Sequence, residues 1–176
     1  EAINTMSPGD TTIPTEPEPE PEPPIVLKED EFLLSSITNG NLPDTGIDHI
    51  MKRFDKDSFP VEAQLDIPPE DSGYLWDPNA LEAMWLAHKL NKKFLGTGHP
   101  GTGKTTGIRQ FCAIMRQPVV RFNGKDGIDQ SSFLGGITTE PTKEGGTALV
   151  WKDGMLPYGI RNGYMVLIDE VFKIPA

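Results

Sequence analysis

The chain has 176 residues, with 16 Lys and Arg against 26 Asp and Glu, so its formal net charge is −10. This length suits one domain with appendages. Nine acids and one base fall in residues 1–31, which leaves the rest of the chain close to neutral. This balance gives no support to a broadly basic surface, and we therefore do not expect nucleic acid as a partner.

The sequence shows none of the features of a membrane or secreted protein. No run approaches the roughly 18 apolar residues that a membrane-spanning helix needs. The N-terminus is acidic and lacks the apolar segment of a signal peptide. Cys112 is the only cysteine, which excludes an intramolecular disulfide and a metal site built from several cysteines. We expect a cytoplasmic protein without membrane contact.

The N-terminal part of the chain differs in composition from the rest. Residues 16–24 alternate glutamate and proline, a pattern that stays extended and solvated. We expect residues 1–24 to form a disordered acidic tail, which serves as a spacer or as a docking segment for a basic partner. Residues 25–73 hold short apolar runs separated by prolines, and they predict short elements or a linker packed on the main domain.

Regular elements are predicted from residue 74 onward. Asp77 can cap a helix over 78–93, in which Met84 and Trp85 are assigned to the core and His88 to an ordinary helix position. The elements expected after it are a short buried strand at 94–95, a helix over 105–116, a strand over 118–122 and a strand over 164–168. This order predicts an α/β fold.

Residues 98–105 read Gly-His-Pro-Gly-Thr-Gly-Lys-Thr, a full Walker A motif. Glycines let the backbone curl around a phosphate, and the helix that follows presents its positive end to the same anion. Lys104 is expected to reach the β- and γ-phosphates, and Thr105 to offer its hydroxyl to Mg²⁺. The alternative is a glycine-rich turn without a ligand. The predicted nucleotide-binding residues are Gly98, His99, Pro100, Gly101, Thr102, Gly103, Lys104, Thr105 and Thr106.

A second motif is typical of the same chemistry. Residues 165–170 are a hydrophobic strand that ends in Asp169 and Glu170, the Walker B pattern. Asp169 is predicted to hold Mg²⁺ together with Thr105, and Glu170 to orient the attacking water. A strand that merely ends in surface acids is the alternative. Because the two motifs are mutually consistent, they predict one site for ATP and Mg²⁺, with Glu170 and Lys104 as the catalytic residues.

The segment between the two motifs predicts a β-hairpin insert. Two short strands flank Gly145 and Gly146 and would project from the sheet domain. Two interpretations stay open for it. The hairpin is a moving element that contacts a substrate or partner, or an ordinary hairpin that packs Trp151 against the core.

With these motifs, the chain resembles an AAA+ ATPase of the MoxR/dynein-related group, and more narrowly the CobS subunit of aerobic cobaltochelatase. The likeness covers about residues 74–176 and rests on the P-loop together with residues 74–77, 118–123 and 151–157. It implies a P-loop NTPase with a three-layer α/β/α parallel sheet. It also implies that residues 74–176 are the N-terminal half of an AAA+ module, whose sensors, arginine fingers and helical lid lie beyond Ala176.

The resemblance also implies partners. Proteins of this group form hexameric rings with ATP between neighbours, and CobS-like rings work with a partner that carries a von Willebrand factor A domain. The assembly remodels a client protein, in cobaltochelatase the large subunit that inserts Co²⁺ into a corrin ring, and the hairpin would contact the client. Two other functions compete with this ATP-driven motor: a nucleotide-gated interaction module with little turnover, and a GTP-driven motor of the McrB type.

Overall fold

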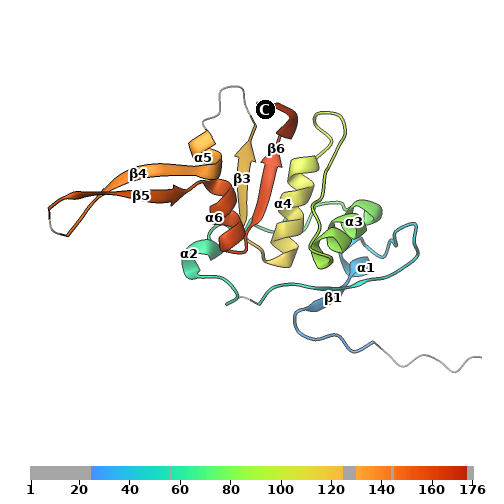
Figure 1. Cartoon of the computed structure of the whole chain (residues 1–176). Helices are drawn as coiled ribbons and strands as arrows, with labels where there is room; N and C mark the ends of the chain where they lie inside the picture. The colour runs from blue at the N-terminus through green and yellow to red at the C-terminus, as the bar shows by residue number, and fades with distance from the viewer. Residues whose placement is uncertain (1–24, 56, 125–129, 144, 174–176) are drawn as a thin grey trace, which may run out of the picture.

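A computed structural model describes residues 25–55, 57–124, 130–143 and 145–173 (Figure 1). The predicted acidic tail, residues 1–24, lies outside the described residues. The elements in chain order are β1 (Glu31–Leu33), α1 (Leu34–Ile37), β2 (Ile50–Lys52), α2 (Val61–Gln64), α3 (Pro78–Lys89), α4 (Lys104–Met115), β3 (Val119–Asn123), α5 (Gln130–Leu134), β4 (Gly135–Pro141), β5 (Thr147–Asp153), α6 (Met155–Arg161), β6 (Met165–Asp169) and a 3₁₀ turn (Val171–Lys173).

Strands β3 and β6 form a parallel pair with helices on both faces. The register places Val119 opposite Met165 and Asn123 opposite Asp169, so both strands end at the same edge. Met165 packs in the cluster that contains the apolar residues of α4. Gly159 of α6, by contrast, lies against the next residue of the strand, since a Cβ added to it would meet Val166. Because side chains alternate along a strand, α4 and α6 cover opposite faces of the pair.

The elements before residue 74 pack on the same core as the helices that follow. Strands β1 and β2 are antiparallel, and Phe32 lies opposite Met51. Both side chains are buried in a cluster with residues of α3 and α4, so this region contributes to the core. The buried members of the cluster are Phe32, Leu34, Met51, Leu81, Met84, Trp85, Phe111, Ile114 and Met115.

The helix expected over 78–93 is shorter in the structure. Asn91 adopts φ 51°, in the left-handed region that asparagine tolerates better than most residues. The N–H of Lys92 then donates to the carbonyl of Ala87, and that of Asn91 to the carbonyl of His88. These two bonds form a Schellman motif, which closes α3 at Lys89.

The short buried strand expected at 94–95 is absent from the structure. The side chains of Phe94 and Leu95 are 44% and 64% exposed. A strand needs a neighbour for its N–H and C=O groups, and residues 94–97 pair with none of the described strands. The segment therefore runs as an extended connection from α3 to the loop before α4, and the prediction is wrong on this point.

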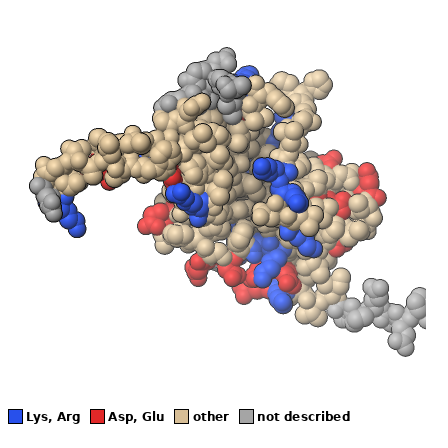
Figure 2. Space-filling view, in the orientation of Figure 1, with Lys and Arg blue, Asp and Glu red and all other residues tan. Residues whose placement is uncertain are grey.

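Strands β4 and β5 form an antiparallel hairpin that extends away from the rest of the chain (Figure 1). Its register pairs Ile137 with Trp151 and Thr139 with Leu149, so these side chains share one face. Trp151 is 60% exposed and its indole N–H donates to Asp153. The interpretation in which Trp151 packs against the core is therefore wrong. Figure 2 shows that the arm of the hairpin carries little charge between its tip and its base.

Candidate nucleotide-binding site

The loop before α4 has the backbone conformation that its glycines allow. Gly98, Gly101 and Gly103 have φ of 146°, 80° and 78°, a region that other residues rarely adopt. A Cβ on Gly101 or Gly103 would meet no atom within 4 Å, so conformation rather than crowding requires glycine there. Residues 96–102 are exposed, which leaves the loop open to a ligand from solvent. Gly103 leads directly into α4.

Lys104 folds back over this loop. Its Nζ donates to the carbonyls of Gly98 at 2.9 Å and His99 at 2.7 Å, and lies 3.4 Å from the hydroxyl of Thr102. An ammonium group has three donors and no acceptor, so an anion held by the loop can take over these bonds. Thr106, by contrast, is exposed on the surface of α4. The structure thus places Lys104 over the loop, as a phosphate-binding role requires.

Thr105 and Asp169 meet at the end of the strand pair. The hydroxyl of Thr105, in the first turn of α4, donates to Oδ2 of Asp169 at 3.0 Å. The Arg121 guanidinium donates to the same oxygen at 2.7 Å. The hydrogen bond from Arg121, followed by that from Thr105, holds the pKa of Asp169 below its ordinary value, although partial burial opposes this shift. The carboxylate is therefore ionised at neutral pH.

This pair fits the ligand preference of Mg²⁺. Magnesium takes oxygen ligands, and it is usually held by one or two protein groups together with phosphate oxygens and water. Thr105 supplies a hydroxyl and Asp169 a carboxylate at one point. Among the described residues, no three His, Cys, Asp or Glu side chains gather into a metal site of their own. The arrangement therefore suits a cation that arrives with a nucleotide.

Glu170 lies beside this pair, but its carboxylate contacts another residue. Its backbone has φ 53°, a conformation that is unusual for a glutamate and marks a strained turn at the strand end. The Glu170 N–H donates to Asp169, whereas its carboxylate accepts a bond from Lys173 at 2.8 Å. The structure brings Thr105 and Asp169 into contact, and it does not bring the carboxylate of Glu170 to them.

Sequence reasoning missed Arg121 as a member of this site. Arg121 comes two residues before Asn123, which lies opposite Asp169 in the parallel register. Residues two apart on a strand face the same way, so an arginine at this position can reach the strand end next to it. The signal for Arg121 is the parallel register of the two strands, which the structure shows and no motif of the sequence contains.

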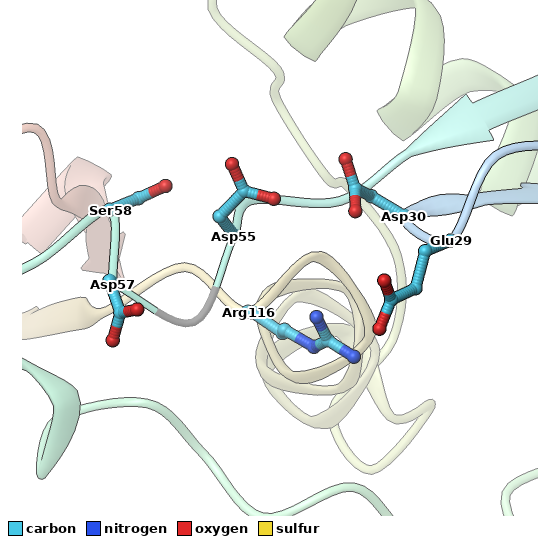
Figure 3. Close-up of a pocket in the computed structure, with 6 residues that line it drawn as sticks. All are labelled: Glu29, Asp30, Asp55, Asp57, Ser58 and Arg116. Carbon is cyan, nitrogen blue, oxygen red and sulfur yellow. The ribbon is translucent and has the colours of Figure 1, made fainter.

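A separate pocket lies at the other end of α4. It encloses about 480 Å³ and lies beside Arg116, the residue that follows α4 (Figure 3). The side chain of Arg116 points toward Glu29 in this view. Four carboxylates line the pocket, which makes it unsuitable for a phosphate group. This pocket therefore does not compete with the loop at the start of α4 as the candidate site for a nucleotide.

The chain matches a known protein family in its C-terminal half. Residues 94–176 match the AAA domain of the dynein-related subfamily. Residues 94–176 of the chain belong to this domain family. The match covers the glycine loop, α4, the strand pair and the hairpin, so the contact between Thr105 and Asp169 lies within this AAA domain.

The chain is also similar to proteins of several kinds. The chain is 30% identical over 135 residues to an aerobic cobaltochelatase subunit CobS of Sinorhizobium sp, a match that covers 74% of this chain and 40% of that protein. It is 30% identical to an uncharacterized protein of Staphylococcus epidermidis, covering 54% of this chain and 36% of that protein. It is 34% identical to midasin of Dictyostelium discoideum, covering 47% of this chain and 1% of midasin.

The chain thus spans about 40% of the length of the CobS subunit that it matches. No solved structure matches it. In the described parts of the chain, no helix has both the length and the apolar character needed to cross a membrane.

Proposed function

We propose that this chain is part of an ATP-hydrolysing AAA+ motor subunit that binds Mg²⁺–ATP between its glycine loop and the end of β6. The observation that carries the proposal is the 3.0 Å hydrogen bond between Thr105 and Asp169. It places the two predicted metal ligands, which come from separate motifs, at one point beside the loop. The AAA domain of the dynein-related subfamily supports the same function.

Each predicted residue has a distinct role in this proposal. The backbone of residues 98–103 and the N-terminus of α4 surround the phosphates, and Lys104 exchanges its carbonyl partners for phosphate oxygens. Thr105 and Asp169 hold Mg²⁺, which neutralises charge on the β- and γ-phosphates. Glu170 orients the attacking water and accepts its proton after its carboxylate leaves Lys173.

The work done with this ATP is the remodelling of a partner protein. We propose a cytoplasmic homo-oligomeric ring, in the hexameric form that the resemblance implies, with a partner that carries a von Willebrand factor A domain. The similarity to the CobS subunit of an aerobic cobaltochelatase supports a metal chelatase as one client. The β4–β5 hairpin is the client-contacting element in this proposal, because it projects from the body and exposes Ile137, Leu149 and Trp151.

One observation favours a second function, a nucleotide-gated interaction module with little turnover. The carboxylate of Glu170 is bound to Lys173 at 2.8 Å, and in this position it does not orient a water at the phosphates. If the bond persists with nucleotide bound, the site would bind ATP without hydrolysing it. The two functions differ in turnover and not in binding.

Phosphate release by the full chain separates these functions. It is measured with Mg²⁺–ATP and Mg²⁺–GTP side by side, together with binding of each nucleotide. The motor account predicts steady release from ATP. Binding without release supports the gated module, release from GTP alone supports the GTP-driven motor, and absence of binding contradicts the proposed site.

A further inference from the structure

We propose that Arg121 is an electrostatic gate on the magnesium site, and that Mg²⁺ has to displace its guanidinium from Asp169 before the nucleotide complex forms. Arg121 is a positioning residue in this proposal, since it acts through Asp169 and touches neither the phosphates nor the loop. The inference rests on the proposed function, because it concerns the same metal site.

The contact that carries the inference is a shared oxygen. Oδ2 of Asp169 accepts from Arg121 at 2.7 Å and from Thr105 at 3.0 Å, while Oδ1 accepts from the backbone N–H of Glu170. A cation held by both Thr105 and Asp169 would lie beside the carboxylate oxygen that faces Thr105, which is Oδ2. Arg121 is therefore bound to the metal-facing oxygen.

The sheet fixes Arg121 in this position. Arg121 lies opposite Leu167 and two residues before Asn123, which is opposite Asp169. Arg121 and Asp169 thus point to the same face of the strand pair, the one covered by α4. Because both residues belong to paired strands, the ion pair does not depend on a loop conformation.

Charge makes this ion pair a competitor of the metal. Arginine stays protonated at every physiological pH, so its charge cannot be removed by titration. A divalent cation at Oδ2 and a guanidinium at the same oxygen repel each other, and either one weakens the attraction of the carboxylate for the other. The side chains of Arg121 and Asp169 are 48% and 24% exposed, so the pair is accessible to an ion from solvent.

The structure also provides room for the displaced side chain. A pocket of about 280 Å³ adjoins Arg121, between the 65–69 segment and α4. Its lining includes Asp66, a carboxylate that can receive the guanidinium, and Arg109 of α4, a second cation that the carboxylate would have to offset. Arg121 can therefore leave Asp169 without a change in the backbone of β3.

The experiment measures how much Mg²⁺ the full chain needs to bind a fluorescent ATP analogue. Wild type is compared with Arg121→Gln, which keeps hydrogen-bond donors and removes the charge, and with Arg121→Lys, which keeps the charge. Arg161→Gln on α6 is the matched control, because Arg161 pairs with Asp153 instead. Arg121→Met repeats the loss of charge if the glutamine variant does not fold. Binding of the ATP analogue in EDTA measures the affinity of the site without metal.

The half-saturating Mg²⁺ concentration should fall about two- to fivefold in Arg121→Gln, the range expected for a partly exposed ion pair. It should stay near wild type in Arg121→Lys and Arg161→Gln, and binding in EDTA should not change. An unchanged or raised Mg²⁺ requirement in Arg121→Gln overturns the gate, and a raised one would mean that Arg121 orients Asp169 for the metal. If wild type binds no nucleotide at any Mg²⁺ concentration, the proposed function fails first and the gate with it.

Discussion

The hydroxyl of Thr105 donates to the carboxylate of Asp169 at 3.0 Å, although 64 residues separate the two along the chain. Thr105 lies in the first turn of the helix after the glycine loop, and Asp169 ends the strand that lies next to β3. The contact requires that α4 cover one face of the strand pair with its first turn at the carboxyl edge. The fold therefore assembles the candidate nucleotide site, and neither motif forms it alone.

Loss of the Lys104 ammonium should weaken nucleotide binding. Lys104 bonds two carbonyls of the loop, and in the proposed complex these bonds pass to phosphate oxygens of ATP. A charged hydrogen bond contributes about 1.5–3 kcal/mol, so Lys104→Ala should raise the Kd for ATP by at least about tenfold. Fluorescence titration measures this Kd, with Lys92→Ala, at an exposed residue just after α3, as the control. Equal affinities in the two variants would place the phosphates elsewhere.

His88 should make the fold sensitive to acid. Its ring lies against Phe54, Trp85 and Phe111, and burial lowers the pKa of His88 below its ordinary value of 6.5. The unfolded chain then binds more protons than the folded chain below about pH 6.5, so the free energy of unfolding should fall as the pH decreases from there.

The histidine variants test this assignment. In urea unfolding between pH 7 and 5, His88→Phe should lose part of the pH dependence, because a phenyl ring cannot take up a proton. His99→Gln, at an exposed position of the loop, should keep the wild-type slope. A slope that is unchanged in His88→Phe would show that other groups cause the acid sensitivity.

A side chain at Gly159 should lower the stability of the fold. A Cβ at this position of α6 would lie 2.6 Å from Cγ2 of Val166 and 3.0 Å from Cγ2 of Val120. Overpacking of this kind costs about 1–3 kcal/mol, and the better helix propensity of alanine offsets about 1 kcal/mol of it. Gly159→Ala should therefore lower the free energy of unfolding by about 1 kcal/mol. Gly96→Ala is the control, since its Cβ would meet only Phe94, at 3.6 Å. Equal stability of the two variants would mean that α6 shifts freely on the sheet.

Local pattern was enough to predict the elements whose signals lie within the element itself. The helix expected over 105–116 is α4 (Lys104–Met115), and the strand expected over 164–168 is β6, one residue later. The strand at 94–95 failed because pairing depends on a neighbour elsewhere in the chain. Helix α6 was missed because it contains Pro157 and Gly159, and proline and glycine usually interrupt helices. In the structure Pro157 stands in the first turn, where its missing N–H has no partner to lose.

The candidate site also combines residues that the sequence predicts with residues that it does not predict. The loop and the acidic strand end were visible in the sequence because each is a contiguous motif. Arg121 and Lys173 belong to no motif, and their contacts with Asp169 and Glu170 depend on strand register and on the turn after β6. Such partners follow from tertiary structure, which a single sequence does not specify residue by residue.

The most direct test of the account is phosphate release from Mg²⁺–ATP by the full chain and its Glu170→Gln variant, with Glu140→Gln on the hairpin as the control. Loss of a general base lowers turnover by about 10²–10⁴-fold, so Glu170→Gln should lose nearly all activity and still bind ATP as tightly as wild type. Glu140→Gln should release phosphate at the wild-type rate. Normal turnover in Glu170→Gln would contradict the assignment of Glu170, and ATP binding without phosphate release in wild type would contradict the motor itself.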